Sequence, residues 1–283
     1  GMGIAMLRLA SASIDRTLQT EKMAQLGENG SGLYPKDHGI TFDKVCFSYE
    51  NKEILHGIDA VIPDKTTTAV IGPSGSGKTT LCNLIARFWD VDSGSVRIGG
   101  HDVREYTLES LMDQISMVFQ NVYLFADTIE NNIKFGRPDA THAQVVEAAK
   151  KACCAEFIEA LPDGYNTVIG EGGASLSGGE KQRISIARAM LKDAPIVILD
   201  EATAYIDPEN EAVIQKAIGS LVRGKTVLVI AHRLSTIRDA DQIAVVKDGQ
   251  IEAVGKHEEL RKNCPLYEAM WRAHIGAKDG EAA

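Results

Sequence analysis

The chain has 283 residues, of which 44% are hydrophobic and 24% charged, and its formal net charge is −9. This composition is that of a globular protein that buries a substantial core. The acidic balance argues against non-specific nucleic-acid binding, which requires a basic surface. The five cysteines show no CxxC spacing, so the sequence indicates neither a disulfide framework nor a zinc site. No apolar run approaches the ~18 residues that would span a bilayer.

The first regular pattern covers residues 3–23 and predicts an amphipathic helix. A glycine-rich stretch at residues 27–32, followed by Pro35, then predicts a flexible linker. The pattern alone leaves two interpretations open for the helix. It is either a terminal helix loosely docked on the domain, or the cytosolic end of a transmembrane helix whose body lies outside this sequence.

Beyond residue 39 the pattern changes to short strands mixed with helices. Residues 40–47 and 57–62 alternate apolar and polar side chains, as half-buried antiparallel strands do. Residues 66–71 form a β-branched run that ends at a glycine-rich loop. A helical pattern follows at residues 78–89. This part of the chain therefore predicts an antiparallel β region and the first strand and helix of an α/β core.

The second half of the chain supplies the rest of that core. Continuous apolar runs at residues 196–199 and 226–230 predict parallel strands that are buried on both faces. Residues 243–246 and 251–254 flank an Asp-Gly pair, which predicts a hairpin. Residues 140–191 are mostly helical. The fold class is therefore α/β, with a parallel core, an antiparallel β region in front and a helical insertion.

Two adjacent cysteines, Cys153 and Cys154, fall within this insertion. They lie in a helical pattern at residues 145–160. We expect them to pack in the interior rather than to carry redox chemistry.

The glycine-rich loop fits the pattern GxxxxGK[ST], with a predicted strand before it and a helix after it. Glycines let successive backbone N–H groups point at phosphate oxygens, and the helix N-terminus adds a favourable partial charge. In such loops the lysine reaches the β- and γ-phosphates and the hydroxyl binds Mg²⁺. The residues that we assign to phosphate binding are Gly72, Pro73, Ser74, Gly75, Ser76, Gly77, Lys78 and Thr79.

A pair of carboxylates, Asp200 and Glu201, follows the buried run at residues 196–199. The C-terminal edge of an open α/β sheet is where ligands bind. Two neighbouring carboxylates repel each other, which makes a purely structural role wasteful. We expect Asp200 to hold the Mg²⁺ shell and Glu201 to act as general base toward the attacking water.

A second phosphate site is predicted at Leu176–Glu180 (LSGGE), which opens a helix at residues 181–191. Ser177 and Glu180 have the spacing of a capping box. Gly178 and Gly179 have no side chains, so they leave backbone N–H groups accessible at the helix start, which favours an anion. One chain thus carries two phosphate-binding helix starts, and one nucleotide that uses both would take the second from another copy of the chain.

With these motifs in this order, the sequence resembles the ATP-binding cassette (ABC) family over about residues 40 to 273. LSGGE is the signature of that family. The resemblance implies a P-loop NTPase mixed sheet with an antiparallel β subdomain and a helical (signature) subdomain. It divides the chain into a membrane-helix tail and linker (1–35), an ATPase domain (36–276, helical subdomain about 122–192) and a disordered tail (277–283).

The resemblance assigns further residues, one position at a time. Tyr49 is similar to the aromatic residue that stacks on adenine, and Thr80 extends the nucleotide-binding loop. Gln120 is similar to the glutamine that contacts Mg²⁺ and water and senses the membrane domain. His232 is similar to the histidine that contacts the γ-phosphate. Asp207 occupies the place of the D-loop aspartate. With Glu201 and Lys78, Gln120 and His232 complete the catalytic set that we expect.

The subfamily is indicated by three shorter stretches. Residues 120–133 and 170–172 are similar to exporter sequences, and residues 10–16 are similar to the junction at which an exporter's last transmembrane helix meets its ATPase. This favours the membrane-tail interpretation of the first helix. The D-loop departs from the family, because Ala204 and Tyr205 follow Thr203 where a serine is usual. We expect its contacts across a dimer to differ accordingly.

The resemblance therefore implies an ATPase that takes ATP and Mg²⁺ and dimerises, with an identical or a different second domain, around two nucleotides. Its other partner is the transmembrane domain of the same full-length chain, and no nucleic acid is expected. We expect the domain on the cytoplasmic side of the cell (inner) membrane and the fragment itself to be soluble.

Three other classes of protein share parts of this pattern. DNA-repair and chromosome-structure ATPases share LSGGE, but they carry long coiled-coil insertions between the glycine-rich loop and LSGGE. Only roughly 100 residues separate those two motifs here. Cassettes of translation or iron–sulfur assembly lack the exporter-like tail. A degenerate cassette that only binds ATP would not be expected to keep Glu201 and His232.

Overall fold

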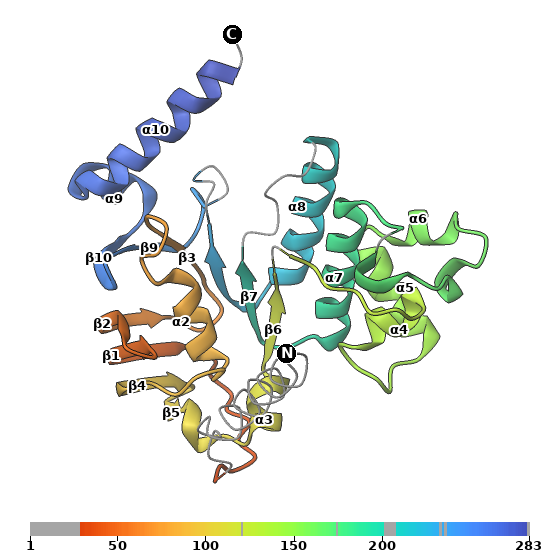
Figure 1. Ribbon diagram of the computed structural model, residues 1–283, viewed down its shortest axis with the longest axis horizontal. Helices are drawn as coiled ribbons and strands as arrows, with labels where there is room; N and C mark the ends of the chain where they lie inside the picture. Colours follow the sequence, from red (N-terminus) through yellow and green to blue (C-terminus); the bar gives the residue numbers. More distant parts are fainter. Residues whose placement is uncertain are drawn as a thin grey trace, which may run out of the picture.

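Figure 1 shows a computed structural model of the chain, in which residues 29–119, 121–173, 175–200, 208–231, 234 and 237–281 are described. Within these ranges no helix is both long and apolar enough to cross a bilayer. The helix expected at residues 3–23 lies outside them.

The strands form two sheets. The antiparallel sheet has the order β2-β1-β4-β5, and the six-stranded sheet has the order β10-β9-β3-β8-β7-β6, in which only β10 runs antiparallel to its neighbour. The strands are β1 (Ile40–Tyr49), β2 (Lys52–Ile62), β3 (Thr67–Ile71), β4 (Ser93–Ile98), β5 (His101–Asp102), β6 (Ile115–Val118), β7 (Ile196–Asp200), β8 (Thr226–Ile230), β9 (Gln242–Lys247) and β10 (Gln250–Gly255).

The strands and the hairpin predicted from the sequence are confirmed, as is the α/β class. The sequence pattern did not predict β4, β5 or β6. β6 pairs in parallel with β7 along its whole length, from Ile115 to Val118, so the parallel core extends one strand further than expected.

Helices lie between the sheets and beyond β6. They are α2 (Lys78–Ile85), α3 (Leu108–Asp113), α4 (Ile129–Lys134), α5 (His142–Lys151), α6 (Ala155–Glu159), α7 (Gly178–Lys192), α8 (Pro208–Val222), α9 (His257–Asn263), α10 (Pro265–Glu281), and the 3₁₀ turns η1 (Val103–Glu105), η2 (Gly164–Asn166) and η3 (Glu171–Gly173).

The predicted helical insertion is confirmed as α4 to α7, which lie on the side of β6 away from the antiparallel sheet (Figure 1). Its buried residues form one core with β6, β7 and α8, centred on Ile133, Val145 and Ile184. The cysteine pair does not lie within a helix as expected. Cys153 has φ 56° and separates α5 from α6, while Cys154 is buried, so the packing role is retained but the helical pattern is broken.

α2 packs between the two sheets. Its residues Leu81, Leu84 and Ile85 share a core with β1, β2 and β4 on one side and with β7 and β8 on the other. The helix ends at Ile85, four residues before the predicted end, because Arg87 takes a left-handed backbone conformation with φ 53°. A non-glycine residue in that region stops helix propagation.

The expected linker is partly docked on the domain. The backbone N–H of Ser31 donates to Glu105 at 2.7 Å, and the carbonyl of Ser31 accepts from Thr107 at 2.9 Å. The side-chain amide of Gln114 donates to the Leu33 carbonyl at 3.0 Å. Residues 31–33 are therefore held against the β5–α3 region and do not form a free spacer.

The C-terminal helices α9 and α10 pack against β3 and β9 of the parallel sheet. His257 is 4% exposed, and its Nδ1 lies 2.7 Å from the hydroxyl of Tyr267. Its ring also meets Trp271 edge to face, with centroids 4.4 Å apart. α10 continues to Glu281, so residues 277–281 are helical where a disordered tail was expected. Extending an existing helix adds one hydrogen bond per residue without a new nucleus.

One turn joins the antiparallel sheet to the loop after β3. Gly249, between β9 and β10, donates its N–H to the Ser76 carbonyl at 3.1 Å and accepts at its carbonyl from the His56 N–H at 2.9 Å. A Cβ at Gly249 would lie 2.1 Å from the Ile54 carbonyl oxygen. β2 and the glycine loop are thus fixed to each other through a backbone contact that only glycine permits.

We predict that Gly249→Ala lowers the free energy of unfolding by about 1–3 kcal/mol more than Gly224→Ala does, because only the former must displace a backbone carbonyl. Both glycines have φ near 70°, but a Cβ at Gly224 meets nothing within 4 Å. Urea unfolding of the two variants isolates the contact from the backbone strain that they share. Equal losses would show that the close approach contributes nothing.

A second prediction concerns pH. Burial lowers the pKa of His257, so the folded state disfavours the protonated ring. The contribution of the neutral His257 ring to the free energy of unfolding is complete above the pKa of the unfolded chain, about 6.5. It is lost as the pH falls through the lowered pKa of the folded state. Between pH 7.5 and 5.5, wild type should lose more unfolding free energy in urea than His257→Gln. The difference in slope should reach at most about 1.4 kcal/mol per pH unit. The exposed His101→Gln should follow wild type; a His257→Gln variant that did the same would contradict the account.

Candidate functional site

The glycine loop connects β3 to α2 in a conformation that its sequence requires. Gly77 is the N-cap of α2 with φ 104°, and a Cβ there would lie 2.6 Å from Leu55. No side chain caps this helix start. An uncapped N-terminus with its partial positive charge favours an anion.

The ammonium of Lys78 lies inside the loop. Its Nζ donates to the carbonyls of Gly72 and Pro73, both at 2.8 Å, and lies 3.5 Å from Ser76 Oγ. The residue is 6% exposed. A buried charge must be matched by acceptors, and here loop carbonyls supply them next to the start of α2.

A cavity of about 290 Å³ opens over this loop. Its walls bring together most of the residues predicted to bind phosphate, and they add two residues of β2. The lining residues are Lys52, Ile54, Ser74, Gly75, Gly77, Lys78, Thr79 and Thr80.

Asp200 ends β7 at the same edge of the sheet. Its partner across the ladder is Ile230, which in turn pairs with Val70 at the end of β3. β7 and β3 are therefore two strand spacings of about 4.8 Å apart, and Asp200 lies that far across the sheet from the end of β3, where the glycine loop begins. Burial raises the pKa of the Cys82 thiol well above its usual range, and the Asp200 carboxylate raises it further. That coupling places Asp200 near the helix that carries Thr79.

Tyr49 is held at the end of β1 by three side chains. Its hydroxyl accepts a hydrogen bond from Asn83 Nδ2 at 3.2 Å. Its ring meets Phe47 and Trp89 edge to face, at centroid distances of 4.7 and 5.4 Å. Tyr49 is thus an oriented aromatic group on the strand that neighbours β2.

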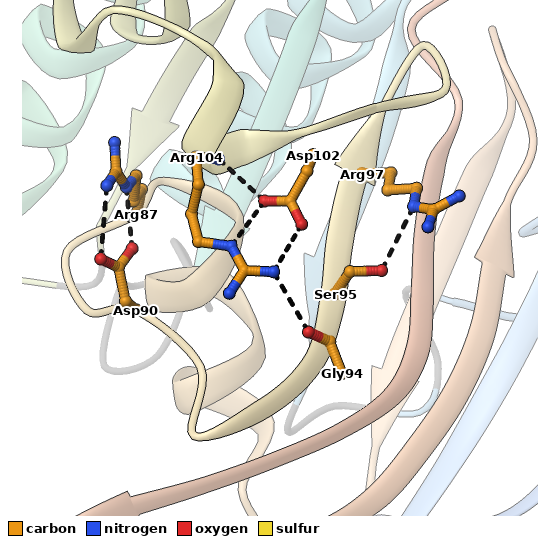
Figure 2. Close-up of polar contacts among 7 residues, drawn as sticks. All are labelled: Arg87, Asp90, Gly94, Ser95, Arg97, Asp102 and Arg104. Carbon is orange, nitrogen blue, oxygen red and sulfur yellow. Dashed lines mark hydrogen bonds and ion pairs between the residues drawn. The ribbon is translucent and has the colours of Figure 1, made fainter. Parts of the chain in front are cut away.

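The loop that carries Trp89 is itself fixed by an ion pair, which Figure 2 shows. Arg87 Nε donates to Asp90 Oδ1 at 2.8 Å, and Nη2 donates to Oδ2 at 3.3 Å. In the same view Arg104 binds Asp102 at 2.7 Å. Bidentate pairs fix geometry as well as charge, so Arg87 and Asp90 hold Trp89 beside Tyr49.

The second predicted phosphate site has the capping box that its sequence predicts. Ser177 Oγ accepts from the Glu180 N–H at 3.3 Å, and Glu180 Oε2 accepts from the Ser177 N–H at 2.8 Å. The two glycines differ in role. Gly179 packs on Asn210, which a Cβ would meet at 3.0 Å, whereas Gly178 faces open space.

This second site does not line the cavity over the glycine loop. Ser177, Gly178 and Gly179 are absent from its walls, and α7 lies on the opposite side of β6 from α2 (Figure 1). The two helix starts predicted to bind phosphate therefore lie at separate places in the described part of the chain.

Several predicted site residues fall outside the described residues. They are Gln120, Glu201, Asp207 and His232. Three of them follow the ends of strands of the parallel sheet, because Val118 ends β6, Asp200 ends β7 and Ile230 ends β8, whereas Asp207 precedes α8. The residue before Gln120, Phe119, accepts at its carbonyl from Gln182 Nε2 at 3.5 Å, which links this region to α7.

The residues that surround Tyr49, and those that β2 adds to the cavity, were not expected from the sequence. Asn83 and Trp89 lie in or just after α2, and no local pattern relates them to a tyrosine more than thirty positions earlier. Lys52 did carry a signal. It follows Tyr49 by three residues, at the other end of a predictable tight turn.

Comparison with known proteins identifies the family. A family model described as "ABC transporter" matches residues 55–204, just over half of the chain. The ATP-dependent lipid A-core flippase of Desulfotalea psychrophila is 52% identical over 85% of this chain. The flippase of the same name from Escherichia coli K12 is 47% identical over 84%. The chain spans less than half of these relatives, 42% and 41% of their respective lengths.

A solved structure shares the fold. The chain superposes on one described as a bacterial Atm1-family ABC exporter with ATP bound, with a TM-score of 0.85 and 39% identity, over 95% of this chain and 47% of that one. These matches agree with the glycine loop, the capped LSGGE helix and the mixed sheet described above. The chain therefore belongs to the ABC transporter family, and it is the nucleotide-binding ATPase domain of the exporter type.

Proposed function

We propose that this domain binds ATP with Mg²⁺ in the cavity over the glycine loop and hydrolyses it, and that the cycle drives transport by a membrane domain. The observation that carries the proposal is the cavity itself. It joins an uncapped helix N-terminus to a lysine whose ammonium is held by loop carbonyls. Phosphate oxygens would replace those carbonyls as partners of Lys78.

The remaining nucleotide contacts follow from position. Tyr49, held by Asn83 and Trp89, would stack on adenine. The backbone N–H groups of residues 72–77 would bind phosphate oxygens, and Thr80 would line the same wall. Orientation of a ring before binding reduces the entropy that binding must offset.

The residues fit a magnesium ion. The family implies one, and Mg²⁺ usually takes one or two protein oxygens together with phosphate and water. Thr79 lines the cavity, and the Asp200 carboxylate is near enough to α2 to raise the pKa of Cys82. Thr79, Asp200 and Gln120 would hold the ion, which would neutralise phosphate charge.

The chemistry is assigned to two residues beside these. Glu201 would orient and deprotonate the attacking water, and His232 with Lys78 would stabilise charge on the γ-phosphate in the transition state. We infer that Asp207 takes part across a dimer from the D-loop, whose Ala204 and Tyr205 depart from the family.

A dimer is supported by the separation of the two anion sites. Ser177, Gly178 and Gly179 lie away from the cavity of their own chain, and Gly178 faces open space. A second domain, identical or different, would bring its capped helix to the phosphates. Two such domains would enclose two nucleotides with two-fold symmetry.

The membrane partner is supported by exposed aromatic residues, several of which stand close to Gln120 in the sequence. The rings of Phe125 and Phe135 stack at 4.2 Å, and Tyr123 meets Phe125 edge to face at 5.2 Å. Phe119, Tyr123, Phe125 and Phe135 are 39–56% exposed. Exposed apolar patches mark interfaces, and we propose that cytoplasmic loops of the membrane domain cover these residues.

The remainder of the transporter is inferred from the relatives. Their names describe lipid flippases, and more than half of their length lies outside the match. We propose that this domain is fused to a transmembrane domain through residues 1–35 and works at the cytoplasmic side of the inner membrane. A lipid substrate is the proposal that these names support.

We predict that Glu201→Gln binds MgATP with near wild-type affinity but loses most turnover, by about 10²-fold or more, because the water loses its base. The variant should accumulate as an ATP-bound dimer. Phosphate release and size-exclusion chromatography with ATP measure the two effects. Glu156→Gln, an exposed acid on α6, is the control. Unchanged turnover in Glu201→Gln would remove this residue from the base role.

A further inference from the structure

Lys52 begins β2 and lines the cavity over the glycine loop together with Lys78. It pairs directly with Tyr49 across a two-residue turn, in which Glu50 has φ 53°. Residues directly opposite each other on an antiparallel pair have their Cβ atoms about 5 Å apart on the same face. The adenine candidate and this lysine are therefore neighbours.

The charge of Lys52 is not neutralised within the described part of the chain, where no carboxylate forms an ion pair with it. The adjacent acid, Glu53, is 3.0 Å from His56 instead. The ammonium of Lys78, by contrast, is occupied by loop carbonyls at 2.8 Å. Lys52 is thus a second basic residue, exposed, in the lining of the cavity of a chain whose net charge is −9.

The backbone of this lysine is fixed relative to the loop. Two residues further along β2, Ile54 also lines the cavity, and its carbonyl abuts Gly249. Gly249 in turn binds Ser76 and His56 through its backbone. Because Gly249 holds β2 at Ile54 and His56, and Lys52 itself pairs with Tyr49 on β1, the backbone of Lys52 cannot move away from the loop without breaking these contacts. Its side chain is flexible, so the ammonium can still reach acceptors at different positions.

We propose that Lys52 is a nucleotide-binding residue whose ammonium pairs with phosphate oxygens of the bound nucleoside di- or triphosphate. It pairs with Tyr49, the candidate for adenine stacking, and it lines the cavity over the glycine loop, the candidate for phosphate binding. The inference rests on the proposed function, because it needs a nucleotide in this cavity. It adds a contact from β2 to those of the loop and of the partner domain.

The test is nucleotide affinity in the whole chain, measured by calorimetry for MgATP, MgADP and adenosine. Lys52→Gln should raise the Kd of MgATP and MgADP about tenfold, the value of one charge-assisted hydrogen bond, and should leave adenosine unchanged. The loss should shrink as salt is raised, and Lys52→Arg should retain most of the affinity. Lys262→Gln, exposed on α9, is the matched control.

The outcomes separate this inference from the proposed function. If wild type fails to bind MgADP, or Lys78→Ala binds it as well as wild type does, the proposed site is wrong and this inference with it. If wild type binds and Lys78→Ala does not, but Lys52→Gln equals wild type, only the role of Lys52 is overturned. An equal loss for adenosine and MgADP would also overturn it, because Lys52 would then act on the base or the fold.

Discussion

The backbone contact at Gly249 is the constraint on which the site depends. The glycine loop belongs to the parallel sheet, whereas Tyr49 and Lys52 belong to the antiparallel sheet, and these are separate hydrogen-bonded units. Gly249 bonds to Ser76 in the first and to His56 in the second. The side-chain amide of Gln242 on β9 also donates to the Val61 carbonyl on β2 at 2.7 Å, but of these two contacts only that of Gly249 reaches the glycine loop, through the Ser76 carbonyl. The glycine loop, at the proposed phosphate end of the site, and Tyr49, at the proposed base end, are therefore held in a fixed relative position.

The rest of the fold places the cavity over the glycine loop and the LSGGE helix in different parts of the domain. Strand order brings Asp200 within two strands of the loop at the C-terminal edge of the sheet, where an open α/β sheet binds its ligands. The helical insertion carries the capped LSGGE helix away from that edge, beyond β6. The proposed dimer follows from this separation. A domain whose second anion site cannot reach its own cavity is suited to reach that of another domain.

Much of this could be predicted from the sequence, because the loop, the acidic strand end and the capping box are local patterns. Periodicity gave the buried strands β7 and β8 for the same reason. It did not reveal that Cys153 breaks the helix between α5 and α6, because its left-handed backbone leaves no trace in hydrophobic spacing. Nor did it reveal the roles of Asn83 and Trp89, since their contact with Tyr49 depends on tertiary packing. The Gly249 contact could not be predicted either, because it forms between segments that only the folded arrangement of the two sheets brings together.

The central claim is that each site is completed by a second chain, and it can be tested directly by mixing two inactive variants. Lys78→Ala disables the loop. Gly178→Asp places a carboxylate where the described chain leaves open space, and a helix N-terminus tolerates the charge. The measurement is ATPase activity of the pure variants and of their equimolar mixture. The account predicts that each variant alone is nearly inactive and that the mixture recovers roughly a quarter of wild-type activity, because half of randomly paired dimers contain one intact site. A mixture no more active than its components would contradict it.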